Sequence, residues 1–393
     1  MSGPDLRGAA AIAGVAESDL GEVGPGRYAL DLAAQAAGAA LADAGLSTRD
    51  VDGLFCAIAG RGMAPLDVAE YLGVRPRYTD GTMVGGSSFV SHLHHAALAI
   101  AAGACHTALI VYGSTARSDS VHAGNGRGRL PAAPPETPSY EAAYRPRMPV
   151  TGYALAAARH MHQYGTTRAQ LAEVAVAARQ WARLNPRAFV RDPLTVEDVL
   201  ASRIVSSPLS VLDCCLVTDG GGALVVTAAD RAGHLRRPPV YLLGAGEAHW
   251  HRAISQMPDL TVTAATESSR RAYEMAKVGP QDVDVVQLYD AFTINTVLFL
   301  EDLGFCAKGE GGAFVSGGRI APGGSLPVNT NGGGLSYCHP GMYGIFTLIE
   351  AARQIRGEAG ERQQPDVTIA LAHGNGGQLS SQATAILGSE QAL

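Results

Sequence analysis

The sequence has few charged residues, no block of five or more basic residues and no Cys-x-x-Cys pair. Charged side chains make up 17% of the 393 residues and the formal net charge is −6, so nucleic acid is not an expected partner. Apolar side chains make up 47%, which excludes a mostly disordered chain. Without paired spacing, the cysteines are expected to be buried free thiols and no structural zinc site is expected. They are Cys56, Cys105, Cys214, Cys215, Cys306 and Cys338.

A long uninterrupted apolar segment is also missing. The longest apolar stretch, residues 96–112, is broken by Gly103 and by the polar residues that follow it. A membrane-spanning helix needs about 20 apolar residues, so this stretch predicts a helix that leads into a buried strand. The apolar stretch 9–16 near the N-terminus reaches Glu17 too soon for a signal peptide. We therefore expect a cytoplasmic protein with no membrane span.

What the sequence does contain is an internal duplication. Residues 40–55 and 273–286 share the same order of features, a helical pattern, a turn and a strand pattern, and Asp50-Val51-Asp52 corresponds to Asp282-Val283-Asp284. Each unit is preceded by a further strand candidate. The repeat predicts two similar α/β halves, residues 1–235 and 236–393, each with a sheet covered by helices.

An irregular segment separates the two halves. Residues 114–149 are rich in Gly, Pro, Ser and Arg, and helical patterns resume at 152–164, 167–185 and 195–201. Irregular stretches of this length in compact proteins usually have a function or cover a site. We expect an insertion at about 115–205 that covers the site and helps to hold the substrate.

A helix is predicted after Gly85-Gly86-Ser87-Ser88. Its apolar residues recur three and four apart as far as Ile100, and its N-terminus presents free backbone N–H groups. His92, His94 and His95 lie on this helix. Because His94 and His95 are expected to point to different faces, packing is favoured over metal binding and no metal site is expected.

Four segments, in order, resemble motifs of the thiolase superfamily. They match its nucleophile helix, its Asn-Glu-Ala-Phe or His-Asp-Ala-Phe turn, its Gly-His-Pro turn and its terminal Cys-x-Gly loop. The segments are residues 85–103, 289–293, 332–344 and 373–377. Residues 303–306 and 354–360 resemble the sterol-carrier-protein-X-type branch in particular. The resemblance implies a thiolase fold, in which two duplicated βαβαβ halves form αβαβα layers, and an enzyme that acts on a CoA thioester, pairs as a homodimer and uses no cofactor besides its substrate.

The chain departs from the thiolase pattern at both catalytic cysteines. The nucleophile position holds Gly86, followed by Ser87 and Ser88, and the second cysteine is matched by His373. A serine hydroxyl is a poor nucleophile at neutral pH unless a base lies against it. His339 matches the family histidine that donates to the thioester oxygen, where a donor stabilises the charge of an enolate.

The catalytic candidates follow from this comparison. Tyr289 and Tyr337 lie at two motif turns and could transfer protons if their pKa falls, His339 would hold the enolate, and His373 completes the set. The substrate-binding candidates are Gly86, Ser87, Ser88, Asp290 and Asn375.

The missing cysteines and the Tyr-Asp-x-Phe-Thr turn resemble the thiolase-like aldolases of bacterial steroid side-chain degradation. The implied reaction is retro-aldol cleavage of a 3-hydroxyacyl-CoA. His339-Pro340 and His373-Gly374-Asn375, however, are closer to ordinary sterol-carrier-type thiolases. Two alternatives therefore stay open: an acyltransferase with an unconventional nucleophile, and a non-catalytic acyl-CoA or lipid-binding subunit.

The resemblance also implies binding partners. Relatives in this branch work with a small OB-fold, zinc-ribbon protein that helps to bind acyl-CoA. Arginines of the covering segment are candidates for contacts with the CoA phosphates. These are Arg117, Arg127, Arg129, Arg145 and Arg147.

Overall fold

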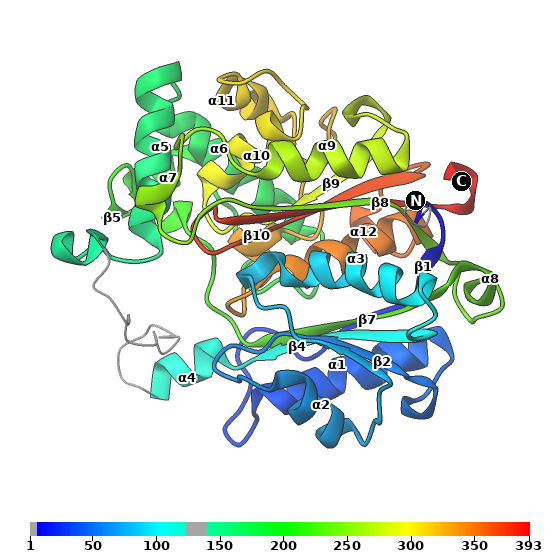
Figure 1. Ribbon diagram of the computed structural model, residues 1–393. Helices are drawn as coiled ribbons and strands as arrows, with labels where there is room; N and C mark the ends of the chain where they lie inside the picture. The colour runs from blue at the N-terminus through cyan, green and yellow to red at the C-terminus, as the bar shows by residue number, and fades with distance from the viewer. Residues whose placement is uncertain (1–5, 123–139) are drawn as a thin grey trace.

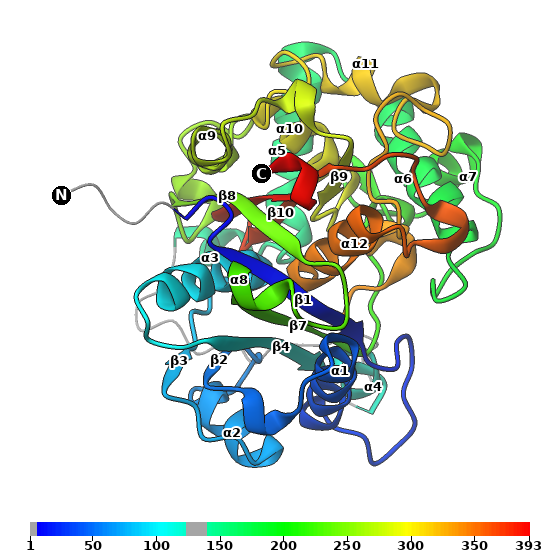
Figure 2. The same ribbon diagram turned by 90° about the vertical axis from the view of Figure 1, so that its right-hand side faces the viewer.

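The protein is described by a computed structural model that covers residues 6–122 and 140–393. Nine strands form one sheet in the order β3-β2-β4-β7-β1-β8-β11-β10-β9, and β5 and β6 form a separate two-stranded sheet. The sheet bends into two arms that lie apart, with helices α3 (Ser88–Ala101) and α12 (Gly344–Arg356) between them (Figures 1 and 2). Further helices cover the outer face of each arm, which gives the αβαβα layering expected from the sequence.

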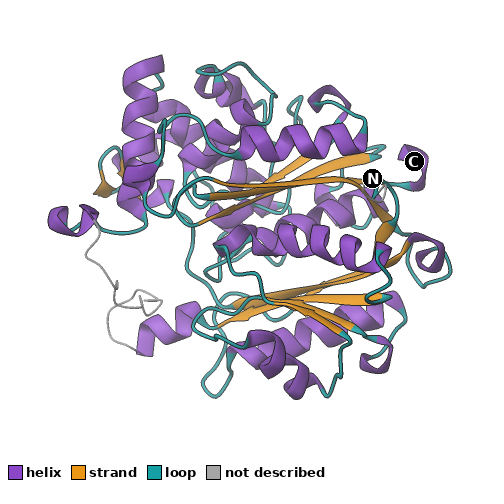
Figure 3. Ribbon diagram, viewed as in Figure 1, coloured by secondary structure: helices purple, strands orange, loops and turns teal. Residues whose placement is uncertain are grey.

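The first arm comes from the N-terminal part of the chain. Its strands are β1 (Ala10–Glu17), β2 (Gly53–Cys56), β3 (Tyr78–Asp80), β4 (Thr107–Ser114) and β7 (Gly220–Ala228). Helices α1 (Ala29–Ala44) and α2 (Ala64–Leu72) cover its outer face (Figure 3). Because helices pack on both faces, β1 and β2 are buried along their whole length.

The second arm comes from the C-terminal part. Its strands are β8 (Val240–His249), β9 (Val285–Leu288), β10 (Ile369–Gly376) and β11 (Ser381–Gly388), and its outer helices are α9 (Ala265–Ala276) and α10 (Thr293–Asp302). The arms join where β1 pairs with β8, at Ala11 with Tyr241 and Ile12 with Val240.

The duplication predicted from Asp-Val-Asp is confirmed in atomic detail. Asp52 Oδ1 accepts hydrogen bonds from the backbone N–H groups of His106 and Thr107, both at 2.8 Å. Asp284 Oδ2 accepts in the same way from Thr368 at 2.8 Å and Ile369 at 2.9 Å. In each half, the carboxylate therefore fixes the start of the neighbouring parallel strand.

Helices α5 (Val150–Tyr164), α6 (Arg168–Arg183) and α7 (Val196–Ala201) form the helical part of the insertion as far as it is described. They follow the predicted helical ranges closely. Buried His160 of α5 hydrogen-bonds to Glu301 of α10 at 3.0 Å, which ties the insertion to the C-terminal arm. Residues 123–139 of the Gly- and Pro-rich stretch, which include Gly124 to Arg129 and Pro131 to Pro138, lie outside the described residues. The remaining short elements are α4 (Ala116–His122), β5 (Ile204–Ser206), β6 (Leu209–Ser210), α8 (Ala229–Ala232) and α11 (Gly311–Val315).

Two details differ from the sequence expectations. All six cysteines are free, but only Cys56, Cys105 and Cys338 are buried and the other three are partly exposed. His94 and His95 do not point to different faces, because both imidazoles reach Glu247, at 2.8 and 3.2 Å. Within residues 6–122 and 140–393, no helix is both long and apolar enough to cross a membrane.

Candidate active site

A tyrosine–histidine pair lies at the centre of the candidate site. Tyr289 follows strand β9, and its hydroxyl lies 3.0 Å from Nε2 of His339, which precedes helix α12. Burial lowers the pKa of His339 to about 4 and raises the pKa of Tyr289 well above 10. The imidazole is therefore neutral and the phenol keeps its proton. In the tautomer that carries its proton on Nδ1, Nε2 accepts the hydrogen bond from the phenol.

A second tyrosine completes an aromatic group around the imidazole. The ring of Tyr343 lies nearly parallel to that of His339, with ring centres 6.3 Å apart, and perpendicular to that of Tyr289 at 5.8 Å. Its hydroxyl donates to Asn331 Oδ1 at 2.8 Å. We did not single out Tyr343 from the sequence, although its place in Gly341-Met-Tyr-Gly344, just after the histidine turn, is the signal that could have found it.

The ring of Tyr289 fills the space that a side chain at position 86 would need. A Cβ atom placed on Gly86 would lie 1.9 Å from Cε2 of Tyr289 and 2.7 Å from the carbonyl oxygen of Asn375. No side chain fits at position 86 while the Tyr289 ring is where it is. The phenol therefore fills the place that the resemblance assigns to the nucleophilic cysteine.

The turn that carries His339 is held by two neighbours. Thr218 accepts from the backbone N–H of His339 at 3.0 Å and donates its own N–H to the His339 carbonyl at 3.2 Å. Tyr112 of β4 donates its hydroxyl to the Pro340 carbonyl and accepts from the Met342 N–H at 3.2 Å. These bonds fix the imidazole in front of Tyr289.

Asp290 holds the turn that precedes His339 in the chain. Its carboxylate accepts from the backbone N–H of Gly334 at 2.6 Å, at the start of the π-helical turn Gly333–Tyr337. A Cβ on Gly333 would lie 2.0 Å from Asp290 Oδ2, so the glycine permits this close approach. Burial raises the pKa of Asp290 to about 7. These contacts support a structural role for the carboxyl group.

The hydroxyl of Tyr337 hydrogen-bonds to Glu17 and not to a member of the tyrosine–histidine pair. Its hydroxyl donates to Glu17 Oε1 at 2.9 Å, and Glu17 is also bound by Arg353 and Arg187. Burial would raise the pKa of Glu17, but the two guanidinium groups lower it to about 2. The structure thus brings Tyr289 and His339 together and places Tyr337 in a buried ion-pair network.

Ser87 and Ser88 are occupied by local contacts. The Ser87 hydroxyl donates to the Val84 carbonyl at 3.1 Å and shares a 2.7 Å hydrogen bond with Ser381, whereas Ser88 accepts from the Val84 N–H at 3.0 Å. No histidine nitrogen hydrogen-bonds to either hydroxyl among the described residues. Ser381 in turn hydrogen-bonds to Nδ1 of His249 at 2.8 Å, so Ser87 reaches a histidine only through a second hydroxyl. Neither Ser87 nor Ser88 has a base in direct contact.

His373 and Asn375 belong to a buried polar chain on β10. His373 bonds to Thr384 and to Gln382 Oε1, both at 2.9 Å, and burial lowers its pKa to about 4. Gln382 also donates to Asn375 Oδ1, and Asn375 Nδ2 donates to the hydroxyl of Tyr153 at 2.8 Å. Both ring nitrogens of His373 are therefore engaged away from Tyr289.

Comparisons with known proteins identify the family. Residues 246–389 match the family described as "Thiolase C-terminal domain-like". An acetyl-CoA acetyltransferase of Methanothermobacter thermautotrophicus is 34% identical over 376 residues, which span 93% of this chain and 96% of the relative. The chain belongs to the thiolase superfamily.

Two further matches fall within this superfamily. A steroid side-chain-cleaving aldolase of Thermomonospora curvata is 34% identical over 381 residues, covering 93% of this chain and 95% of the relative. The solved structure named Ltp2-ChsH2(DUF35) aldolase has a TM-score of 0.87 at 32% identity and covers 98% and 99% of the two chains. The predicted thiolase fold and the expectation of an enzyme of this superfamily are confirmed.

Thiolase chemistry needs a thiolate near the imidazole, and the described site offers none. All six cysteines lie in the described ranges, and none of their sulfurs hydrogen-bonds to a histidine nitrogen. Cys338 adjoins His339 in the chain, but burial raises its pKa well above the usual range. A buried thiol of this kind is unreactive.

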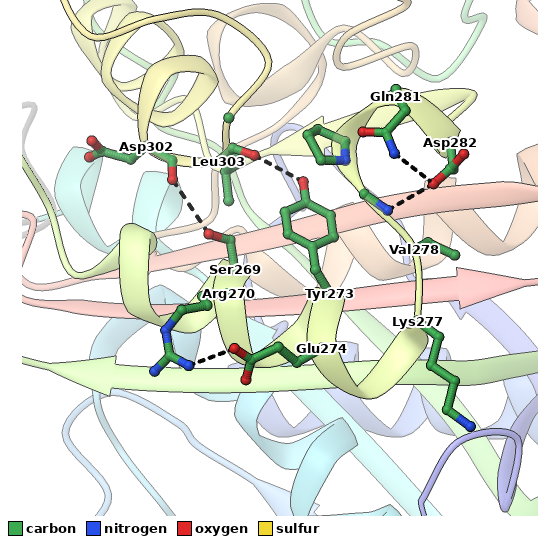
Figure 4. Close-up of a pocket in the computed structure, with 13 residues that line it drawn as sticks. Ser269, Arg270, Tyr273, Glu274, Lys277, Val278, Gln281, Asp282, Asp302 and Leu303 are labelled. Atoms are coloured by element: carbon green, nitrogen blue, oxygen red, sulfur yellow. Dashed lines mark hydrogen bonds and ion pairs between the residues drawn. The ribbon is translucent and has the colours of Figure 1, made fainter.

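A separate surface pocket of about 700 Å³ lies beside α9 (Figure 4). None of the predicted site residues lines it. It reaches Asp302 at the C-terminal end of α10, roughly 15 Å along the helix from the end that follows Tyr289. Its polar groups pair with one another, as Tyr273 does with the Leu303 carbonyl at 3.0 Å. This pocket is therefore not part of the candidate active site of this thiolase-superfamily chain.

The arginine candidates of the covering segment are only partly described. Arg127 and Arg129 lie outside the described residues. Arg117 is paired with Glu22 at 2.8 Å and covers the Phe189 ring, so its guanidinium is already engaged. Arg145 and Arg147 lie on the stretch that leads into α5, and their assignment to CoA phosphates stays a prediction.

Proposed function

We propose that the protein cleaves the Cα–Cβ bond of a 3-hydroxyacyl-CoA by a retro-aldol reaction. One observation carries the proposal: the Tyr289 ring stands where a thiolase nucleophile would stand, with its hydroxyl 3.0 Å from Nε2 of a neutral imidazole. A phenol that hydrogen-bonds to an imidazole can move protons, whereas its pKa, raised well above 10 by burial, makes it a poor nucleophile toward a thioester. The names of the Thermomonospora relative and of the aldolase structure support the same reaction.

The proposed steps use only groups in contact. The substrate 3-hydroxyl gives its proton to the Tyr289 oxygen as Tyr289 passes its own proton to His339 Nε2. The oxygen on carbon 3 becomes a carbonyl, the Cα–Cβ bond breaks, and its electrons form the thioester enolate. His339, now an imidazolium, donates its Nε2–H toward the enolate and returns the proton to Cα. The products are a ketone or aldehyde and a shorter acyl-CoA, and no cofactor is consumed.

Tyr337, which the sequence put forward for proton transfer, has no step in this proposal, and Tyr343 is proposed to position the pair. Its ring flanks both members of the pair, while the Tyr337 hydroxyl is committed to Glu17. Asp290, Ser87, Ser88, His373 and Asn375 are proposed to shape the wall of the site.

The direct test supplies the purified protein with 3-hydroxyacyl-CoA thioesters, including steroid side-chain thioesters, and measures the release of ketone or aldehyde. His339→Ala should abolish release while acyl-CoA binding survives. A near-normal rate in His339→Ala would remove the proposed mechanism.

An acyltransferase is the second candidate, because the Methanothermobacter relative carries that name. It requires a covalent acyl-enzyme. Incubation with an acyl-CoA followed by mass measurement of the intact protein separates the two: an acyl adduct supports the transferase, and its absence together with carbonyl release supports the lyase.

The proposed assembly is a homodimer joined along strand β3. This strand is one edge of the sheet, and its outer side has no partner strand among the described residues. The opposite edge, β9, is partly covered because Val286 bridges to Val328. Large apolar side chains are exposed near β3, on α2 and in the loop after the strand. They are Met63, Leu66, Tyr71 and Met83.

A second subunit of the OB-fold, zinc-ribbon type is part of the proposal. The solved aldolase with a TM-score of 0.87 is named as an assembly of two components, which supports a partner here. Co-purification from the native host, followed by an activity assay with and without the associated protein, tests whether the partner is required.

A further inference from the structure

A cluster of partly buried histidines and carboxylates lies outside the candidate site. Its central residue is His95 of helix α3, whose Nδ1 lies 2.6 Å from Oδ2 of Asp80 and whose Nε2 lies 3.2 Å from Oε1 of Glu247. Asp80 ends strand β3 of the first arm, and Glu247 belongs to strand β8 of the second. One imidazole therefore joins both arms of the sheet through the helix that lies between them (Figure 1).

The two contacts determine the charge of this imidazole. An ionised carboxylate only accepts hydrogen bonds, so a ring nitrogen that faces one must carry a proton. Both ring nitrogens of His95 face carboxylates, which requires the doubly protonated imidazolium. The hydrogen bonds to Asp80 and Glu247 accordingly raise the pKa of His95 to about 10. Burial alone would raise the pKa of both carboxyl groups, but their hydrogen bonds keep it well below the usual range.

Three further histidines complete the cluster. His94 of α3 hydrogen-bonds through Nδ1 to Glu247 Oε1 at 2.8 Å, and Nε2 of His249 on β8 lies 3.8 Å from Glu247 Oε2. His92 of α3 is fully buried, which lowers its pKa to about 4 and keeps it neutral. Among these four histidines, His95 alone contacts two carboxylates, so its charge is the one that the cluster stabilises most.

Asp80 connects the cluster to the candidate site. Its Oδ1 accepts from the backbone N–H and from the hydroxyl of Thr82, both at 2.7 Å, in the short loop that leads from β3 to Gly86. Gly86 is the residue whose missing side chain makes room for the Tyr289 ring. One carboxylate thus holds the loop with one oxygen and the imidazolium with the other, so the position of the loop depends on the charge of His95.

We infer that His95 is a pH-sensitive latch, whose positive charge holds the loop before Gly86 to both arms and whose deprotonation releases it. A histidine with a raised pKa stabilises the fold fully below its ordinary value of 6.5, and this contribution declines as the pH rises toward about 10. The carboxylates set the lower limit, because they must be ionised and their ordinary pKa values are 3.8 and 4.5. The latch is therefore strongest between these limits and weakens through neutral and alkaline pH.

The charge of His95 is tested first in the wild-type protein. Histidine labelled with nitrogen-15 gives ring signals that distinguish an imidazolium from a neutral imidazole, and His95→Gln identifies the signal by its loss. If that variant fails to fold, Asp80→Asn shifts the same signal and makes the assignment. At pH 8 we expect both ring nitrogens of His95 to carry protons. A neutral His95 ring at this pH would overturn the inference.

Urea unfolding at one protein concentration tests the contribution to stability. The unfolding equilibrium constants of the wild type and of His95→Gln should differ most at pH 6. Their ratio should shrink by at most about tenfold for each pH unit above 6.5, since solvent screens part of the interaction. His106→Gln is the matched control, because His106 also bonds to an aspartate, Asp52 at 3.0 Å, but contacts one carboxylate instead of two. Equal pH dependence in both variants, or none in His95→Gln, would refute the latch.

Hydrogen exchange tests the link to the loop. After correction for the intrinsic effect of pH on exchange, amides of residues 81–86 should lose protection between pH 6.5 and 9 in the wild type. In His95→Gln they should already be less protected at pH 6.5, while amides of strand β4 keep their protection in both proteins. Protection of residues 81–86 that does not change with pH or with the substitution would separate His95 from the loop and contradict its role as a latch.

Discussion

At the scale of single residues, the contact between Gly86 and Tyr289 decides the chemistry. Replacing Gly86 with Ala should destabilise the protein by about 1–3 kcal/mol, the usual cost of overpacking, and should displace the Tyr289 ring from His339. Urea unfolding and the cleavage rate measure the two effects. The double variant Gly86→Ala/Tyr289→Ala should relieve the overpacking but stay inactive. Equal destabilisation with and without the Tyr289 ring would contradict the steric account.

The pH dependence of the rate reports on His339. The histidine must be neutral to accept the Tyr289 proton, and burial lowers its pKa to about 4. We expect kcat/KM to stay level as the pH falls from 7 to about 5 and to drop as the pH passes through about 4. The pKa of Asp290, about 7, lies close to the ordinary histidine value of about 6.5. A loss of rate centred near 6.5 that persists in Asp290→Asn would therefore mean that the imidazole titrates as an exposed group.

Sequence patterns reached part of this site. The motif spacing singled out Tyr289 and His339, and their side chains hydrogen-bond to each other. It did not separate Tyr337 from Tyr343, because both are close to His339 in the chain and only the direction of the turn decides which ring faces it.

At the scale of secondary-structure elements, Tyr337 and Glu17 link the π-helical turn to strand β1 and helix α12. Tyr337→Phe removes a hydrogen bond to a carboxylate and should lower the free energy of unfolding by about 1.5–3 kcal/mol. Its kcat/KM should change less than tenfold, whereas Tyr289→Phe should lower kcat/KM more than a hundredfold. A loss in Tyr337→Phe as large as in Tyr289→Phe would restore Tyr337 to the proton-transfer role.

The Glu17 carboxylate also makes stability depend on pH. Its pKa is about 2 in the folded protein and 4.5 without these contacts, so the stabilisation is complete above about 4.5 and is lost as the pH falls toward 2. The difference corresponds to about 3 kcal/mol. Glu17→Gln should therefore flatten the fall in stability between these pH values, as followed by urea unfolding. An unchanged acid limb would contradict the ion-pair assignment.

Secondary-structure elements were easier to predict from the sequence than tertiary contacts. The Asp-Val-Asp repeat predicted the two halves because an aspartate before a strand has a local function. In both copies its carboxylate accepts a hydrogen bond from the backbone beside the start of the neighbouring parallel strand. The pairing of β1 with β8, by contrast, joins residues more than 200 positions apart and leaves no mark in a local pattern.

At the scale of the whole molecule, the exposed edge of β3 predicts how two copies meet. Thr79 is exposed in the middle of this strand, and proline there removes a backbone N–H and disfavours strand pairing. We expect the wild type to sediment as a dimer and Thr79→Pro as a monomer with an unchanged circular dichroism spectrum. A monomeric wild type, or a dimeric Thr79→Pro, would place the interface elsewhere.

The steric exclusion between positions 86 and 289 also limits the order in which such a site can evolve by single substitutions. With a thiol at 86, a phenol at 289 would be displaced from its present position, so the small residue is needed before the phenol can reach His339. The reverse route is blocked in the same way, since a regained cysteine would meet the aromatic ring. Once both changes are in place, the older chemistry is therefore out of reach of any one mutation.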